Sequence, residues 1–192
     1  MSKLSSRNQV LIGIALAMLM AVTRSHHIAA FPHLLDASWA VFFLAGMYLR
    51  PALALPLLLG EAVLIDYLVI TYGGVSSFCV SPAYAALALA YGSLWLAGRW
   101  YAGRAQFRAD TLIPFAVSLV AGASACELIS SGSFYYLSGR VAEPTLAGFG
   151  AGLIAYFPGN AQSFLFYIGL GVLTHLAAML SRRGARASAK AR

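Results

Sequence analysis

The sequence predicts an all-α integral membrane protein, a bundle of six transmembrane helices with both termini in the cytoplasm. Hydrophobic residues make up 60% of the 192 residues and charged residues only 10%, whereas soluble domains carry about 25% charged residues. The mean hydropathy is +0.77. The long segments are also apolar all round, as expected of helices that lipid surrounds.

The apolar segments give the expected helices in order. They cover residues 8–24, 37–50, 51–72, 82–102, 110–136 and 157–181. The second is short, and only Arg50-Pro51 separates it from the third, so a count of four or five spans stays open. No small-residue cleavage site follows the first segment, which is interpreted as a retained span. Residues 1–181 then form a single membrane domain, and residues 182–192 form a basic cytoplasmic tail.

The distribution of Lys and Arg gives the expected orientation. With six spans and a cytoplasmic N-terminus, eleven basic residues lie inside and two, Arg24 and Arg140, lie outside. This bias follows the positive-inside rule and explains the net charge of +7 without nucleic acid. The tail is expected to contact anionic lipid head groups of the bilayer. We expect no nucleotide to bind, since no phosphate-binding motif is present.

Cys79 lies in a short polar break, residues 73–82, on the predicted outer side. A soft sulfur ligand there suggests binding of a transition metal or of a cofactor that carries one. Packing of the loop is the alternative, although the surrounding glycines and serines argue against deep burial. Cys126 is interpreted as a residue of helix packing in mid-span and is not expected to form a disulfide with Cys79.

Three of the four histidines, His26, His27 and His33, lie in the first outer loop. A zinc site that also uses Cys79 and Asp36 is conceivable, but the spacing does not match that of a closed structural site. The alternative is that these histidines are interfacial polar residues at the end of the first span.

Asp66 is an ionisable residue within an expected span, where a charge costs several kcal/mol unless it meets a cavity or a partner. Two interpretations stay open. Asp66 lines an outward-facing cavity, or it pairs with Arg24 or with a hydroxyl of a neighbouring span. Glu61 and Glu127 are interpreted as hydrogen-bonded carboxyls inside the bundle.

Small residues recur at every fourth position of the first span, at Gly13, Ala17 and Ala21. This spacing lets another helix approach closely. It fits packing within the bundle, and it also fits docking of a separate membrane subunit.

Six short spans, a basic cytoplasmic side and this small-residue stripe resemble an S component, the substrate-binding membrane subunit of energy-coupling factor (ECF) transporters. Within that group the chain is similar to the BtuM family, the cobalamin-specific S components of Gram-negative bacteria. The resemblance rests on the region of His27 with the following Phe31-Pro32, on Asp66 in Leu-Ile-Asp-Tyr, and on residues 77–84. In that last segment the lone Cys79 is followed, after Val80, by Ser-Pro-Ala-Tyr.

The resemblance implies uptake of cobalamin or another corrinoid across the bacterial inner membrane, with the substrate bound at the periplasmic face. It implies that the Cys79 thiolate is an axial cobalt ligand and that His27, Asp66 and Tyr84 line the same site. Removal of the upper ligand, as in decyanation, would make Cys79 catalytic, and whether the chain is an enzyme stays open. Gly13, Ala17 and Ala21 would dock an ECF module, although the chain could also work alone.

Two other functions stay open. A membrane thiol-disulfide enzyme would need a second, resolving cysteine, and Cys126 is poorly placed for that role. An importer of a bare cobalt or nickel ion would use Cys79 together with His26, His27 and His33.

Overall fold

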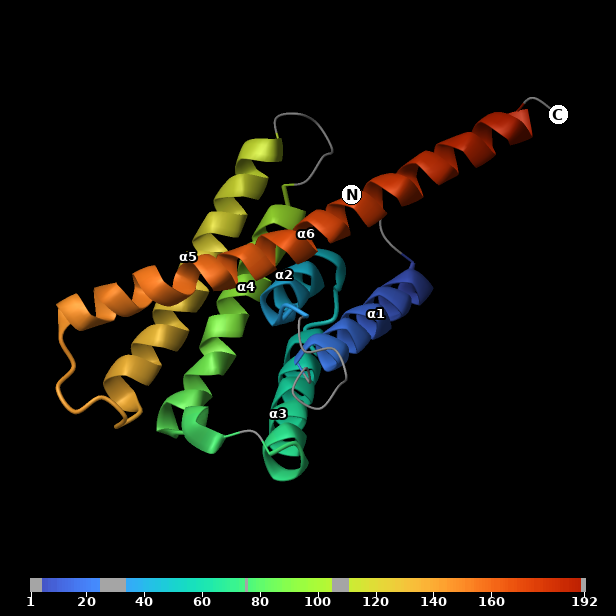
Figure 1. Cartoon of the computed structure of the whole chain (residues 1–192). Coiled ribbons are helices and arrows are strands. Elements are labelled where there is room, and N and C mark those ends of the chain that lie inside the picture. Colours follow the sequence, from blue (N-terminus) through green and yellow to red (C-terminus); the bar gives the residue numbers. More distant parts are fainter. Residues whose placement is uncertain (1–4, 25–33, 75, 105–110, 191–192) are drawn as a thin grey trace.

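The computed structural model describes the backbone of residues 5–24, 34–74, 76–104 and 111–190, and their side chains except those of residues 79 and 182–190. This part of the chain is all-helical, with six α-helices and two short 3-10 helices (Figure 1). In chain order they are α1 (Ser6–Arg24), α2 (Ser38–Tyr48), α3 (Ala54–Tyr72), η1 (Ser77–Cys79), η2 (Pro82–Ala86), α4 (Leu87–Ala102), α5 (Leu112–Leu137) and α6 (Leu146–Lys190). The predicted all-α fold is confirmed.

Four of these helices are long and apolar enough to cross a membrane, namely α1, α3, α5 and the part of α6 that ends at Ser181. The hydrocarbon core of a bilayer is about 30 Å thick. At a rise of 1.5 Å per residue, the 11 residues of α2 cover about 16 Å and the 16 residues of α4 about 24 Å. Each of the six α-helices overlaps one expected segment, although α4 begins at Leu87 and not at residue 82. A count of six full spans is not confirmed.

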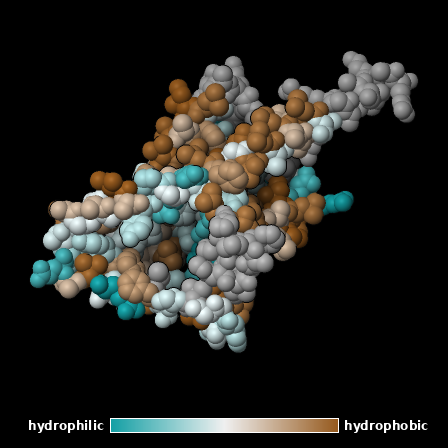
Figure 2. All heavy atoms as spheres, viewed as in Figure 1, coloured by the Kyte–Doolittle hydropathy of each residue, from teal (hydrophilic) through white to brown (hydrophobic). Residues whose placement is uncertain are grey.

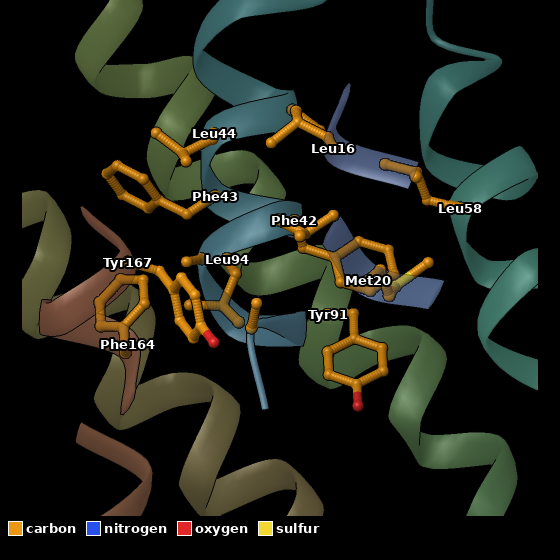
Figure 3. Packing of buried hydrophobic residues seen from close by; sticks show 14 of the residues in the cluster. Leu16, Met20, Phe42, Phe43, Leu44, Leu58, Tyr91, Leu94, Phe164 and Tyr167 are labelled. Atoms are coloured by element: carbon orange, nitrogen blue, oxygen red, sulfur yellow. The ribbon is translucent and has the colours of Figure 1, made fainter. Parts of the chain in front are cut away.

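Helix α2 is the centre of the hydrophobic core (Figure 3). Nearly all of its residues from Ser38 to Gly46 are buried, because α1, α3, α4 and α6 all pack around it. Phe42 stacks on Tyr91 of α4, with 4.4 Å between the ring centroids, and Phe43 meets Phe164 of α6 edge to face at 5.7 Å. A helix that is apolar all round is thus covered here by protein.

Two glycines let α2 and α4 approach each other closely. A Cβ atom at Gly98 would collide with the carbonyl oxygen of Phe43, and one at Gly46 would collide with the carbonyl oxygen of Trp95. Only glycine lets the two backbones come this near, so these positions fix the distance between the central pair of helices.

Helix α6 begins at Leu146, so the prediction that the last span starts at residue 157 is wrong. The Oγ1 atom of Thr145 accepts a hydrogen bond from the backbone N–H of Gly148 at 3.1 Å, which satisfies one of the free donors of the first turn. The hydroxyl of Tyr135 in α5 accepts a hydrogen bond from the N–H of Thr145 at 3.3 Å. The first turn of α6 is therefore capped and tied to the end of α5.

At its other end α6 continues to Lys190, so the backbone of residues 182–190 in the expected tail is helical. Figure 1 shows α6 crossing the other helices, with its C-terminal part extending beyond them. Pro158 lies inside the helix. It leaves the carbonyl of Ile154 without its usual helical partner.

The chain direction defines two ends of the bundle. Asp66 lies in the last two turns of α3, and α4 begins soon afterwards and runs back, so that Arg99 is at the opposite end. We call these the Asp66 end and the Arg99 end. Figure 2 shows apolar side chains over much of the upper part of the viewed face, with polar residues gathered toward the lower left around a hollow. The end of α5 and the start of α6 lie in that polar region (Figure 1).

Candidate functional site

Arg24 and Asp66 form a bidentate ion pair at the Asp66 end. The Nε atom of Arg24 donates to Oδ1 of Asp66, and its Nη2 atom donates to Oδ2, each at 2.6 Å. The Arg24 side chain is 11% exposed and that of Asp66 is 23% exposed. Two parallel charge-assisted hydrogen bonds are the strongest pairing that a carboxylate can make with a side chain. The interpretation that Asp66 pairs with Arg24 is confirmed.

The remaining guanidinium nitrogen of Arg24 contacts α2 and α4. Its Nη1 atom donates to the hydroxyls of Ser38 at 2.9 Å and Tyr91 at 2.8 Å, and it lies 4.0 Å from Oδ2 of Asp36. The Oδ1 atom of Asp36 accepts from both the N–H and the hydroxyl of Ser38, at 2.9 and 2.7 Å. One guanidinium therefore joins α1, α2, α3 and α4.

Tyr84 belongs to the same network. Its hydroxyl donates to Oδ2 of Asp66 at 2.6 Å, so that η2 is tied to α3. The structure thus brings together two of the predicted site residues, and both carboxylate oxygens of Asp66 already have donors. We call Arg24, Asp36, Ser38, Asp66, Tyr84 and Tyr91 the Arg24 network.

The sequence interpretation missed Ser38 and Tyr91 as members of this network. Ser38 is 14 and Tyr91 is 67 positions away from Arg24, so no local spacing relates them. The sequence feature that could have indicated these polar partners is Arg24 itself. A guanidinium has five donors and no acceptor, so one at the end of a span requires several oxygen atoms around it.

The backbone of Cys79 lies in η1, whereas its side chain is outside the part of the chain that the structure describes. The hydroxyl oxygen of Ser76 accepts from the N–H of Phe78 at 3.2 Å and so caps this turn. The Phe78 ring lies 5.7 Å from that of Phe134 in α5, and the guanidinium carbon of Arg140 lies 5.0 Å from its centroid. The turn is thereby packed against the end of α5.

Two residues with tertiary contacts therefore flank Cys79 in the sequence, Phe78 before it and Tyr84 after it. Five residues of chain span at most about 18 Å, so Cys79 and Tyr84 are close enough for one large ligand. Between them the Oγ atom of Ser81 is buried, and it has no hydrogen-bond partner among the described residues. A buried hydroxyl without a partner costs about 1–3 kcal/mol.

The predicted site residue His27 lies in residues 25–33, outside the described part of the chain, together with His26 and His33. Among the described side chains, no group of three or more His, Cys, Asp or Glu residues could hold a metal ion. The fourth histidine, His175 of α6, has its Nδ1 atom 3.1 Å from the hydroxyl oxygen of Tyr48.

The two interior predictions on α5 are confirmed. Cys126 is a free, buried cysteine. The buried carboxylate of Glu127 accepts hydrogen bonds from the hydroxyl of Ser131 at 2.7 Å and from Nδ2 of Asn160 at 3.0 Å. Glu61 of α3 is only half buried, and within the described residues it makes no hydrogen bond, so the prediction of a hydrogen-bonded carboxyl is wrong there.

The small-residue stripe on α1 lies partly against the bundle. Ala17 and Ala21 pack on the buried core, and a Cβ atom at Gly13 would lie 3.7 Å from the side chain of Leu49. The most exposed residues of the helix are others, such as Val10 and Met18. This placement supports packing within the bundle, and docking of a second subunit stays a prediction.

The chain matches no protein-family model and no curated protein. The resemblance to the BtuM family therefore stays a prediction that rests on the residues named for it. Cobalamin binding, the Cys79–cobalt bond and an ECF partner stay predictions with it.

Proposed function

We propose that this protein takes up cobalamin or a related corrinoid across the bacterial inner membrane, with the Cys79 thiolate as an axial ligand of cobalt. The observation that carries the proposal is the hydrogen bond from Tyr84 to Asp66, which anchors the segment that follows Cys79. With Phe78 packed on Phe134 before it, the turn that bears the thiol is held at both ends. A metal ligand on a supported turn is pre-organised for binding.

The orphan hydroxyl of Ser81 also supports a ligand at this position. It is two residues from Cys79 and has no partner among the described residues. The side-chain amides of a corrinoid would supply an acceptor for this hydroxyl, and the cost of its burial would then be recovered on binding. In this proposal Asp66 positions Tyr84, because both of its carboxylate oxygens are already occupied.

A cobalt–thiolate bond also accounts for the proposed decyanation. The thiolate donates an electron pair to cobalt on one axial side, since it is a strong and soft ligand. Cyanide leaves from the opposite side with its own electron pair, so cobalt keeps its oxidation state. This accessory reaction would make Cys79 catalytic, with uptake as the main function.

The distribution of charge favours an orientation with the Asp66 end in the periplasm. Arg50 and Arg99 meet at the other end, where a guanidinium nitrogen of Arg99 donates to the carbonyl of Arg50 at 2.7 Å. Arg24 lies at the Asp66 end, but it is paired with Asp66. Unpaired positive charge stays preferentially on the cytoplasmic side of membrane proteins.

The test is the visible spectrum of the purified full chain with bound cobalamin. We expect shifted corrin bands and one cobalt per chain in the wild type. Cys79→Ala should lose the shift, whereas the matched control Cys126→Ala, which removes the buried cysteine of α5, should keep it. Identical spectra of the wild type and Cys79→Ala would remove Cys79 from cobalt.

The alternatives give different results in the same material. A bare-ion importer would retain tight cobalt or nickel without any corrinoid, which metal analysis after chelation detects. A thiol-disulfide enzyme would cycle a disulfide with a small thiol. The chain has two cysteines in all, and the burial of Cys126 leaves Cys79 without a resolving partner in the same chain.

A further inference from the structure

An apolar groove lies between α4 and α5 at the Arg99 end of the bundle. The two helices run side by side (Figure 1), and the groove between them has a volume of about 550 Å³. This volume falls within the range of about 300–1,000 Å³ that is typical of ligand sites. The lining residues are Leu96, Ala97, Arg99, Trp100, Val117, Ser118 and Ala121.

The packing of α4 on α5 explains why the groove is apolar and where it stops. At Gly122 the helices come so close that a Cβ atom there would crowd Ala97, which closes the groove toward the middle of the bundle. The hydroxyl of Ser118 donates to the carbonyl of Phe115 at 2.8 Å within its own helix. It therefore offers no free donor to a ligand. The outer rim is formed by exposed side chains, including Leu96 and Val117.

Two guanidinium groups mark the open end of this groove. Arg99 lies over the ring of Trp95, with its guanidinium carbon 4.6 Å from the centroid. Arg104 lies over the ring of Trp100 at 4.0 Å. Arg99 donates to the carbonyl of Leu49 at 3.0 Å. Within the described residues, no carboxylate forms an ion pair with either arginine, so their positive charge is available to an anion.

We propose that this groove is a binding site for an anionic phospholipid. One acyl chain would lie between α4 and α5 along Leu96 and Val117, and the phosphate of the headgroup would meet Arg104 and Arg99. Basic pockets between membrane helices on the cytoplasmic side are suited to anionic headgroups, and a tryptophan such as Trp100 favours the level of the headgroups. The proposal does not depend on the corrinoid or on Cys79.

The test is native mass spectrometry of the full chain in detergent, with phosphatidylglycerol or phosphatidylcholine of the same acyl chains. We expect phosphatidylglycerol to bind at least about fivefold more tightly, which corresponds to one basic residue near the headgroup. Arg104→Gln should remove most of this preference, whereas Arg140→Gln at the opposite end should leave it unchanged.

A second pair of variants tests the acyl-chain part of the site. Val117→Trp fills the groove and should lower the binding of both lipids. Val120→Trp is the matched control, since Val120 is on the same helix and similarly exposed, at 68% against 51% for Val117, but does not line the groove. Elution of each variant as a single species shows that it is folded.

Three results would overturn the proposal. The first is equal affinity of the wild type for the two lipids, a result that needs no variant. The second is an equal loss of lipid in Val117→Trp and Val120→Trp. The third is displacement of phosphatidylglycerol by an equal concentration of glycerophosphoglycerol, which carries the same phosphodiester charge but no acyl chain and would indicate a site for the anion alone.

Discussion

Breaking the Arg24–Asp66 pair should destabilise the protein more than removing any exposed arginine. Both side chains are less than a quarter exposed, and removing one partner of a buried ion pair costs about 3–5 kcal/mol because the other charge stays buried. Arg24→Met keeps an unbranched apolar stem in place of the Arg24 stem but leaves Asp66 with the hydroxyl of Tyr84 as its remaining donor among the described residues. It also removes the hydrogen bond to Tyr91. We therefore expect a loss near the upper end of this range.

Asp66→Asn should cost less than Arg24→Met. The amide oxygen of asparagine still accepts one hydrogen bond from Arg24, and Asp36 lies only 4.0 Å from the same guanidinium. We place this loss near the lower end, at about 3 kcal/mol. The double variant should lose less than the sum of the two, with a coupling energy of about 0.5–3 kcal/mol, since the second change removes a charge that the first has already isolated.

The assay is unfolding by urea in detergent, followed by the helical circular dichroism signal. Arg140→Gln is the control, because the exposed Arg140 contacts the ring of Phe78 and such a contact is worth about 0.5–1 kcal/mol. The reasoning is refuted if Arg24→Met costs no more than Arg140→Gln. It is refuted equally if the losses of Arg24→Met and Asp66→Asn are additive.

Two further predictions follow from the packing of α4 and η2. Gly98→Ala should lower the free energy of unfolding by about 1–3 kcal/mol, since its Cβ atom would collide with the carbonyl of Phe43. Gly92 on the same helix has open space around it, so Gly92→Ala should be neutral or stabilising by up to about 1 kcal/mol in the same urea assay. Equal effects of Gly98→Ala and Gly92→Ala would contradict the close approach of α2 and α4 at Gly98. Tyr84→Phe should cost about 1.5–3 kcal/mol, because it removes a hydrogen bond to a charged acceptor, and it should weaken corrinoid binding in an absorbance titration. An unchanged affinity would show that anchoring η2 does not matter for the ligand.

The positions of the helices could be predicted from the sequence because apolar length is a direct consequence of their environment. The first expected span, residues 8–24, matches α1 (Ser6–Arg24), and residues 51–72 match α3 (Ala54–Tyr72). Hydropathy alone could not show that α2 is covered by protein rather than lipid, because both are apolar. The shortness of the expected segment, residues 37–50, was the available signal.

The start of α6 could not be predicted from apolar length alone. Residues 146–156 contain three glycines, which lower helix propensity, and so this segment was expected to be a loop. The helix is stabilised there by contacts that only the fold provides. Phe149 packs on Tyr135 and Tyr136 of α5, with centroids 5.7 and 5.6 Å apart. The hydrogen bond between Thr145 and Tyr135 joins residues ten positions apart, which no local pattern of the sequence indicates.

The contacts of the candidate site, too, could be predicted from the sequence only in part. The pairing of Asp66 with Arg24 could be anticipated because a carboxylate in a span needs a partner, and the structure supplies that partner from α1. The inclusion of Tyr84 followed from the family resemblance, and its hydrogen bond to Asp66 agrees with a shared site. The hydroxyls of Ser38 and Tyr91 depend on how α2 and α4 cross, which no local pattern encodes.

In the folded chain, unpaired positive charge is distributed more unevenly between the two ends of the bundle than the sequence indicates. By composition, Arg24 counts as an exception to the positive-inside bias, but in the structure its charge is paired with Asp66 and lies near Asp36. Arg99 and Arg104, in contrast, contact carbonyl groups and indole rings, and within the described residues they meet no carboxylate. Since unpaired cations are the ones that resist transfer across a membrane, this pairing strengthens the expected orientation. In that expected orientation, the Arg24 network and η1 would lie on the outside, where the proposed corrinoid would arrive.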